Sequence, residues 1–248
     1  LNSENQLLDD KDRKISKSFF KKASMLAFVS KNNLNTAERQ LACEFNNASV
    51  IQNPIKFKTP EIIPLPKTET VRFASVARLE TFYKGQDILF ESLSAKEWKY
   101  RNWECHIYGS GPDRLYLENL ARYYGISDKI HFDGFIDDVK AIWGENHILL
   151  LPSKAEGTPL ALIEAMLCGR PSVVTDIGGM SEWVKDLETG FIADAPTGHS
   201  FGKALEKAWS YKNNWEKLGS NAYTLAFSMK DFNAEKTLLN MLIKSAKK

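Results

Sequence analysis

Cysteine is scarce in this sequence, and charge of one dominant sign is missing. The 248 residues include three cysteines, Cys43, Cys105 and Cys168, which are widely spaced and form no CxxC pair. An odd number of isolated cysteines excludes a disulfide knot. Because Cys105 and Cys168 lie in apolar segments, we expect three buried, reduced thiols, as is typical of a cytosolic protein.

Charges are nearly balanced and long apolar runs are absent. The 33 basic and 31 acidic residues leave a formal net charge of +2, too weak a field for a nucleic-acid-binding protein. The longest uncharged apolar run, around residues 148–152, falls far short of the roughly 20 residues that a membrane-spanning helix needs. We therefore expect no nucleic-acid partner and no spanning helix.

Several chemical motifs are missing as well. The 4 histidines show no HExxH or other metal-ligand spacing, so they are best explained as strand residues, and we expect neither a catalytic metal nor a cofactor. The glycine-rich GxGxxG and Walker A signatures are absent, which argues against a nicotinamide dinucleotide and against P-loop ATP chemistry.

The sequence does contain the material of a globular core. Hydrophobic residues make up 43% of the chain, and 14 Phe, 8 Tyr and 6 Trp exclude wholesale disorder. The first residue is Leu rather than Met, and no signal-like apolar segment follows it. We therefore expect that the amino terminus was removed by truncation or processing, together with any targeting signal.

The first 70 residues have a pattern of their own. Residues 1–22 are polar and rich in Lys and Asp, which predicts a solvated helix or lead-in, with a membrane-surface helix as the alternative. A β-α-β unit follows, with expected elements at residues 25–30, 34–45 and 48–52. Residues 56–70 carry Pro60, Pro64 and Pro66 without a helical period, and we predict a linker there.

From residue 71 onward, strand-like and helix-like runs alternate. The expected strands are residues 71–77, 103–108, 129–132, 148–151, 172–175 and 190–193. The expected helices are residues 86–93, 113–124, 139–143, 159–168, 181–184, 201–212, 215–226 and 233–246. This alternation predicts an α/β fold, a doubly wound parallel sheet of the Rossmann type with helices on both faces. Ligands bind such sheets at the carboxyl ends of the strands.

The loop after the fourth of these strands leads into a helix that could hold an anion. Thr158 suits the N-cap position and Pro159 the first helical position, where its missing N–H is not needed. The backbone amides of Leu160 and Ala161 would then point out of the positive helix end. Gly157 would let a ligand approach the backbone closely.

Two glutamates flank this helix start. Glu156 stands at its mouth, and Glu164 follows about two turns later, roughly 80° around the axis by helix geometry. Apolar neighbours surround Glu164, so we expect its carboxylate to be half buried and to need a partner. The alternative is an ordinary capped helix with one surface glutamate and one structural glutamate.

Cations and glycines follow the other strands. Arg78 and Lys84 come after the first strand of the alternating series, where they could clamp phosphate oxygens or, alternatively, be solvated surface cations. Gly109-Ser110-Gly111-Pro112 permits close contact with a nucleoside, with a plain turn as the alternative. The glycine-containing loops at residues 133–137 and 176–180 are weaker signals of the same kind.

Taken together and in this order, these motifs resemble the carboxyl-terminal half of a retaining glycosyltransferase of the group 1 family, which has the two-Rossmann-domain (GT-B) architecture. The likeness runs from about residue 71 to residue 193. It rests on Arg78, Lys84-Gly85, Gly109-Ser110-Gly111-Pro112, Pro152-Ser153, the E-x7-E pair Glu156 and Glu164, Gly169-Arg170-Pro171, Thr175-Asp176, Gly178-Gly179, Glu182 and Thr189-Gly190-Phe191.

The resemblance implies how the phosphates of a nucleotide-sugar donor are bound. Arg78 and Lys84 would neutralise the diphosphate, and the amides of Thr158 and Leu160, which follow Gly157, would cradle the phosphate nearest the sugar. Two cations and a helix end can stabilise a leaving diphosphate without Mg²⁺, so the resemblance also implies metal-independent transfer.

The resemblance also assigns the sugar, the ribose and the base. Glu164 would accept both ribose hydroxyls, for which a carboxylate has enough acceptor oxygens. Glu156 would contact the transferred sugar near its anomeric carbon, either as a nucleophile or, as we favour, as an electrostatic brace. The nucleoside would be lined by Gly109, Ser110, Gly134 and Phe135.

One departure from the family pattern changes the expected phosphate contacts. Gly-Thr-Pro follows the first glutamate where the family commonly has Gly-Phe-Gly. Pro159 therefore removes one backbone amide, and Thr158 offers a hydroxyl instead.

The resemblance divides the chain into four parts. Residues 1–55 would be a remnant of the amino-terminal acceptor domain and residues 56–70 the linker. Residues 71–230 would form the donor-binding domain, and the helix within residues 231–248 would return to the amino-terminal domain. The missing remainder of that domain is then an expected partner, and the fragment alone would be inactive.

The expected reaction is transfer of a sugar from a nucleotide diphosphate to an acceptor hydroxyl, with the anomeric configuration retained. We expect a cytoplasmic enzyme of polysaccharide biosynthesis, in peripheral contact with the inner membrane face, acting on a saccharide or lipid-linked acceptor. Two alternatives stay open: a nucleotide-sugar-binding module without turnover, and a non-catalytic interaction domain of Rossmann type. Titration with nucleotides and their sugars separates the last from the other two.

Overall fold

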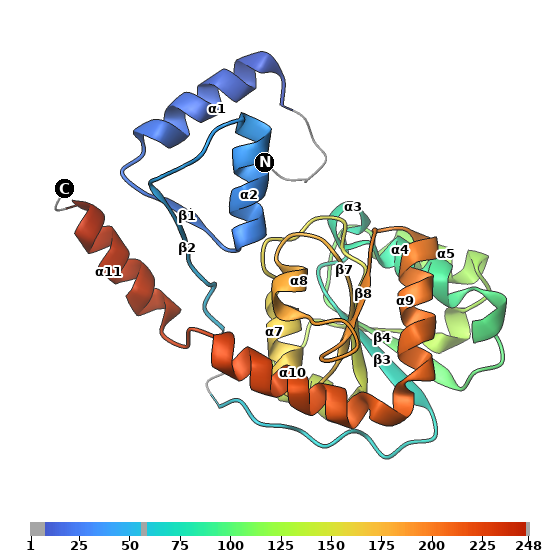
Figure 1. Ribbon diagram of the computed structural model, residues 1–248. Helices are drawn as coiled ribbons and strands as arrows, with labels where there is room; N and C mark the ends of the chain where they lie inside the picture. Colours follow the sequence, from blue (N-terminus) through green and yellow to red (C-terminus); the bar gives the residue numbers. More distant parts are fainter. Residues whose placement is uncertain (1–7, 56–58, 247–248) are drawn as a thin grey trace.

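The computed structural model of the protein describes residues 8–55 and 59–246. Within these ranges the strands form two parallel sheets (Figure 1). The small sheet pairs β1 (Leu26–Phe28) with β2 (Ala48–Val50). The large sheet has the order β5-β4-β3-β6-β7-β8, with strands β3 (Val71–Val76), β4 (Trp103–Tyr108), β5 (Ile130–Gly134), β6 (Ile148–Leu151), β7 (Ser172–Thr175) and β8 (Phe191–Ala193). All the pairings in this sheet are parallel, which confirms the predicted α/β fold.

Helices cover both faces of the large sheet and form two separate cores. One core packs the sheet against α4 (Gln86–Leu93), α5 (Arg114–Tyr123) and α9 (Gly198–Ser210). The other packs it against α6 (Val139–Glu145), α7 (Leu160–Met166), α8 (Met180–Trp183) and α10 (Trp215–Met229). Shorter pieces complete this part of the chain: α3 (Thr81–Lys84) and the 3₁₀ turns Lys96–Trp98, Ser127–Lys129 and Lys212–Asn214.

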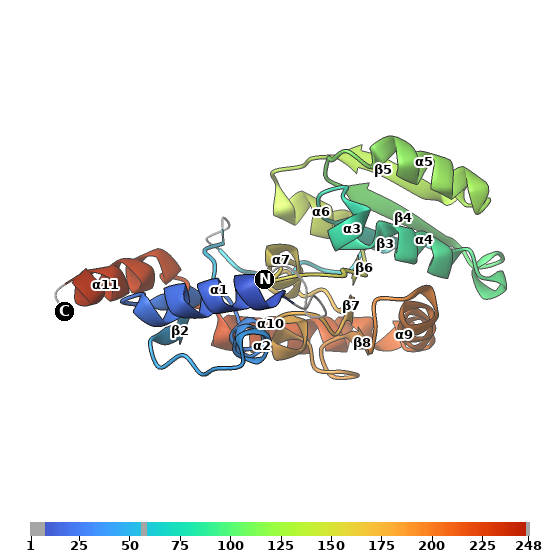
Figure 2. The same ribbon diagram turned by 90° about the horizontal axis from the view of Figure 1, so that it is seen from above.

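A second, smaller unit stands to one side of the large sheet (Figures 1 and 2). It consists of the small sheet with α1 (Asp10–Lys22), α2 (Lys31–Leu41) and, from the end of the chain, α11 (Ala234–Ala246). Hydrogen bonds hold the segment in which the chain passes from α10 of the large domain to α11 of the smaller unit. Gln52 Nε2 donates to Met229 O at 2.7 Å, and Lys230 Nζ donates to Asn53 O at 2.6 Å. The final helix therefore lies against the unit from which the chain starts.

One buried arginine makes hydrogen bonds both to the segment between the two units and to the large domain. Arg170 is 0% exposed, and its guanidinium donates to the carbonyls of Ile63 at 2.5 Å and Pro64 at 2.9 Å. It also bonds carbonyls of the large domain, those of Trp143, Asn146 and Cys168. Burial lowers the pKa of Arg170 to about 10, so the side chain is charged at neutral pH. Arg170 thus helps to order the proline-rich segment on the large domain, together with the hydrogen bond from Ile63 N to Cys168 O at 3.2 Å.

Most predicted elements match the structure, and the largest shift is in α2. The helix predicted at residues 34–45 runs from Lys31 to Leu41. It starts early because Ser30 caps it, with Ser30 Oγ accepting from Asn33 N at 3.1 Å. It ends early because Ala42 adopts the left-handed conformation, with φ 47°.

Two smaller expectations also need correction. Thr158 does not cap α7: Pro159 occupies that position without a side-chain cap, and the Thr158 hydroxyl donates instead to Val29 O at 2.7 Å. All three cysteines are free, and Cys105 and Cys168 are buried as expected. Cys43 is only partly buried, because it follows the turn that ends α2.

Candidate functional site

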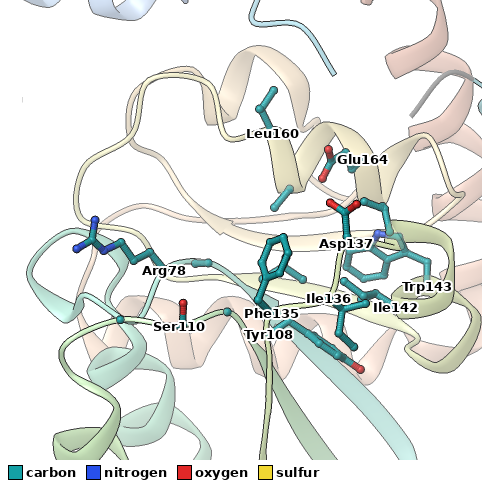
Figure 3. Close-up of a pocket in the computed structure, with 16 residues that line it drawn as sticks. Arg78, Tyr108, Ser110, Phe135, Ile136, Asp137, Ile142, Trp143, Leu160 and Glu164 are labelled. Carbon is teal, nitrogen blue, oxygen red and sulfur yellow. The ribbon is translucent and has the colours of Figure 1, made fainter. Parts of the chain in front are cut away.

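A pocket of about 610 Å³ opens where the loops after β3, β4 and β5 meet the start of α7 (Figure 3). It lies at the carboxyl ends of parallel strands, where the fold predicts a ligand. Among the expected site residues, those that line it are Arg78, Gly109, Ser110, Phe135, Leu160 and Glu164. Figure 3 shows Arg78 extending toward one end of this pocket and Glu164 lying toward the other.

Glycines let the pocket loops come close to one another. Gly109 has φ 133°, and a Cβ there would lie 2.1 Å from Ala77 O. A Cβ on Gly111 would lie 2.2 Å from Leu79 O, so a side chain at either position would push the loops after β3 and β4 apart. Gly109 N also donates to Gly134 O at 2.7 Å, which ties in the loop after β5. Gly134 therefore supports the pocket loops through this bond and does not line the pocket.

One wall of the pocket is apolar. Tyr108, Ile142 and Trp143 are buried and form it, and the Phe135 ring, 72% exposed, stands at the rim. Burial raises the pKa of Tyr108 to about 12, so the phenol stays neutral. Its hydroxyl accepts from Asn146 Nδ2 at 2.9 Å. A flat, uncharged wall with an aromatic rim suits a nucleobase.

Among the described residues, three charged side chains line the pocket, Arg78, Asp137 and Glu164, and the two that the sequence predicted differ in their surroundings. Glu164 is half buried, as expected, in the first turns of α7. Arg78 has a side chain that is 66% exposed, with Nε 3.3 Å from a carboxylate oxygen of Glu80. An exposed guanidinium is free to swing, so Arg78 can reach a phosphate without breaking buried contacts.

Lys84 and Glu156, which the resemblance assigned to separate roles, are bonded to each other. Lys84 Nζ lies 2.6 Å from Glu156 Oε1, and Ser153 Oγ donates to the same oxygen at 2.9 Å. The Glu156 side chain is 9% exposed and that of Lys84 26%. Neither residue lines the pocket: Lys84 ends α3, and Glu156 lies in the loop between β6 and α7. The sequence contained no signal for this pair, because the two residues are 72 positions apart.

Backbone contacts position α3 so that this pair forms. Gly85 has φ 66°, and a Cβ there would lie 2.1 Å from Pro152 O, so only glycine lets α3 pack on the loop after β6. Asp113 accepts from Thr81 N and Thr81 Oγ1, both at 2.7 Å. These hydrogen bonds hold the pKa of Asp113 below its usual range, and the one from the Thr81 backbone has the larger effect.

The small unit touches the same loops, which sequence reasoning missed. Asn32 N donates to Glu182 Oε1 at 2.9 Å, and Asn32 Nδ2 donates to Gly178 O at 2.8 Å. Asn33 Nδ2 donates to Glu156 O at 3.4 Å. A Cβ on Gly157 would lie 2.7 Å from Val29 Cγ2, so the close approach at this glycine is made by the small unit. The only related signal in the sequence was the Ser-x-Asn-Asn segment at the start of α2, which indicates a helix cap and not a contact with these loops.

One cluster in the described part of the chain could hold a metal ion, and it is not in the pocket. It consists of Glu104, His106 and His131, on the neighbouring strands β4 and β5. Across residues 8–55 and 59–246, no helix has the length and apolar character that crossing a bilayer requires.

A family model described as "Glycosyl transferases group 1" matches residues 58–225. An uncharacterized glycosyltransferase of Haemophilus influenzae is 34% identical over 164 residues, covering 61% of this chain and 46% of that protein. The alpha-D-kanosaminyltransferase of Streptomyces kanamyceticus is 25% identical over 144 residues, covering 57% of this chain and 37% of that protein. The chain thus spans less than half of the length of these two relatives.

Solved structures share the fold over nearly the whole chain. Anabaena Alr3699/HepE in complex with UDP and glucose superposes with a TM-score of 0.79 and 19% identity, covering 95% of this chain and 67% of that one. Sucrose-phosphate synthase from Thermosynechococcus elongatus superposes with a TM-score of 0.80 and 20% identity, covering 96% and 62%. At these identities the likeness shows the fold.

Proposed function

Because this chain belongs to the group 1 glycosyl transferases, we propose that it binds the nucleotide-sugar donor of a retaining, metal-independent sugar transfer. The observation that carries the proposal is the pocket at the carboxyl ends of β3 and β4, which joins an apolar wall to a cation, Arg78, and two carboxylates, Asp137 and Glu164. Alr3699/HepE, which shares the fold, was crystallised with UDP and glucose. A nucleoside diphosphate has the matching chemistry: a flat base, a diol and two phosphates.

The donor is assigned to the pocket part by part. The base stacks near Phe135 and the buried wall behind it, and Glu164 accepts the ribose hydroxyls. Arg78 and Lys84 neutralise the diphosphate, with the amides of Thr158 and Leu160 at the phosphate nearest the sugar. Transfer breaks the bond between the anomeric carbon and the phosphate oxygen. The acceptor oxygen bonds that carbon on the same face and gives its proton to the departing diphosphate oxygen.

Glu156 acts in this proposal as an electrostatic brace for the developing positive charge on the sugar. Its Oε1 already accepts from Lys84 and Ser153. A carboxylate oxygen held by an ammonium and a hydroxyl is a weaker nucleophile than a free one, which favours the brace over covalent attack. In this proposal Lys84, which bonds Glu156 in the free protein, also serves the leaving diphosphate when the donor is bound.

Donor binding is tested by the change Glu164→Ala in this chain. We expect UDP, GDP or ADP, alone or with an attached sugar, to raise the melting temperature of the wild-type protein. Loss of hydrogen bonds to a charged acceptor should weaken that binding by about 10- to 100-fold. Glu216→Ala, an exposed glutamate on α10, is the control and should bind as the wild type does.

Two outcomes count against the donor site. Either none of the three nucleotides or their sugars binds, or Glu164→Ala binds them as tightly as the Glu216→Ala control does. Binding without transfer by the full-length gene product would instead favour a nucleotide-sugar-binding module without turnover.

The acceptor side is proposed to work in the cytoplasm at the inner membrane face, on a saccharide or lipid-linked acceptor of polysaccharide biosynthesis. On α1, Ile15 and Phe19 are 57% and 72% exposed and lie one turn apart. Exposed lysines flank them, at Lys11, Lys14, Lys21 and Lys22. An apolar stripe bordered by lysines is complementary to an anionic lipid surface.

The membrane contact predicts a measurable loss of vesicle binding. We expect the wild-type chain to sediment with vesicles containing anionic phosphatidylglycerol and not with phosphatidylcholine alone. Ile15→Ser with Phe19→Ser should reduce that partitioning by about tenfold or more, because two inserted side chains are lost. Leu115→Ser on α5, where Leu115 is 67% exposed, is the matched control and should bind as before. Equal binding of both variants would remove α1 from the proposal.

A further inference from the structure

Two histidines that are 25 positions apart in the sequence are neighbours across the edge of the large sheet. β4 and β5 are parallel, and their register places His106 opposite His131. Glu104 precedes His106 by two positions, so all three side chains lie on one face of the sheet. Trp103, which precedes Glu104, points to the opposite, buried face.

The three side chains converge. One ligand atom from each of Glu104, His106 and His131 lies within 4.8 Å of the others. The imidazole rings are stacked with centroids 4.8 Å apart, and His106 Nε2 lies 3.6 Å from Glu104 Oε2, beyond hydrogen-bond reach. The Nε2 atoms of His106 and His131 are both buried and have no hydrogen-bond partner among the described residues. Buried polar atoms without partners are uncommon, and a bound ion is one recognised explanation.

A fourth side chain orients the cluster. Asp133 Oδ2 lies 2.9 Å from His106 Nδ1. A carboxylate at that distance accepts the Nδ1 proton, and this leaves the lone pair of His106 on Nε2, facing Glu104. Carboxylates hold metal-binding histidines in this way in many metal sites. Aspartate at this position therefore prepares His106 as a ligand.

The local charge also favours a dication. Three carboxylates, those of Glu104, Asp133 and Glu145, contact Arg72 or His106 in this part of the sheet. Arg72 Nε lies 3.5 Å from Glu104, and Arg72 Nη1 lies 3.7 Å from Glu145, so Glu145 can keep the guanidinium when Glu104 turns to an ion. The Glu104 and Asp133 side chains are about one-third exposed, at 34% and 31%, which leaves a path from solvent.

We propose that Glu104, His106 and His131 bind a divalent transition-metal ion, with Zn²⁺ as the best match. Two imidazoles and one carboxylate are a preferred donor set for Zn²⁺, with water as the fourth ligand. None of the three residues lines the donor pocket, so this ion is structural and takes no part in the transfer.

The position of the site indicates the structural role of the ion. The ligands stand on two strands that run directly into Gly109 and Gly134, whose backbones are bonded to each other. Tyr108, which lines the donor pocket, stacks on His106 with ring centroids 6.2 Å apart. An ion that links β4 to β5 would therefore stabilise the apolar wall of the pocket. β5 is an edge strand, so it pairs with a neighbouring strand on one side alone.

The test is metal titration of the chain after treatment with a chelator. We expect one equivalent of Zn²⁺ to bind with a micromolar or lower dissociation constant and to raise the melting temperature. Co²⁺ should give the strong visible absorption of a four-coordinate site. His106→Gln and His131→Gln should each weaken Zn²⁺ binding by about 100-fold, and Asp133→Asn by about 10- to 100-fold, the usual effect of a residue that orients a ligand.

Controls separate this site from adventitious binding. His199→Gln changes a histidine on α9, away from the cluster, and should leave Zn²⁺ affinity unchanged. If a histidine variant fails to fold, Glu104→Gln, at a partly exposed position, replaces it and should also lose the Co²⁺ spectrum. The proposal is overturned if no Zn²⁺ binds below about 100 µM, or if binding survives in both His106→Gln and His131→Gln.

Discussion

Replacing Lys84 by alanine should lower the rate of sugar transfer by roughly 10²–10³-fold, the usual effect of removing one group that stabilises charge in the transition state. Two changes act together. The leaving diphosphate loses a cation, and Glu156, with a side chain that is 9% exposed, keeps Ser153 but loses the ammonium 2.6 Å from its Oε1. The measurement is kcat and KM for the full-length gene product with donor and acceptor supplied.

A second variant separates catalysis from stability. In Lys84→Ala the Glu156 carboxylate is left partly buried without its cation, so the protein should also unfold at lower urea concentration. Adding Glu156→Gln removes that charge and should restore much of the stability, but none of the rate. If the double variant recovered both the stability and the rate of transfer that Lys84→Ala loses, Lys84 would be a structural residue.

Lys154→Ala is the matched control. Lys154 also lies near α3 and pairs with Asp87 at 2.7 Å, but both side chains are about one-third exposed, at 31% and 29%. A pair in that setting contributes little, so the rate should stay within about threefold of the wild type. Full activity of Lys84→Ala would remove the assignment of Lys84 to the diphosphate.

Arg170→Met should destabilise the protein by about 3–5 kcal/mol, because several buried carbonyls lose their donor at about 1–3 kcal/mol each and local relaxation recovers part of that loss. Arg170 is 0% exposed and bonds five carbonyls, of which Ile63 and Pro64 belong to the connecting segment. Methionine fills much of the same volume but donates no hydrogen bond, so these carbonyls lose a buried partner. Urea unfolding measures the change.

Limited proteolysis gives an independent reading of the same variant. The segment with Pro60, Pro64 and Pro66 is held on the large domain through the Arg170 guanidinium, so Arg170→Met should speed cleavage there. Arg170→Lys keeps the positive charge with three donors, so its rate of cleavage should fall between those of the wild type and Arg170→Met. Arg122→Ala, exposed on α5, should change stability by less than about 0.5 kcal/mol. A loss below about 1 kcal/mol in Arg170→Met would contradict the anchoring role, since buried charged hydrogen bonds contribute more than that.

Local pattern accounts for how far the sequence could be interpreted. The strands at 103–108, 148–151 and 172–175 and the helix at 86–93 agree with the structure residue for residue, because each is a compact apolar run bounded by polar or glycine-containing turns. The end of α2 was misplaced because Ala42 takes a left-handed conformation that glycine usually signals. Thr158 was misplaced as a cap because its hydroxyl partner, Val29, lies 129 positions away.

The candidate site divides in the same way. Arg78, Gly109 and Glu164 could be found in sequence because the loops that follow parallel strands, and the helix starts to which they lead, must gather at one edge of the sheet. The bond between Lys84 and Glu156 could not, because it depends on how closely α3 packs on the loop after β6. Asn32 and Asn33 were missed because nothing local ties the start of α2 to the donor loops.

Scarce cysteine and balanced charge excluded other classes of protein, and the alternation of strands and helices was sufficient to determine an α/β fold. The ordered motifs then indicated the family that the family model matches. These are properties of short segments, and the periodicity of each segment records which of its faces is buried. The tertiary structure alone decided which segments meet: Lys84 with Glu156, Arg170 with the connecting segment, and His106 with His131. Strand order and register set those meetings, and they follow from packing of the whole chain, which no local pattern encodes.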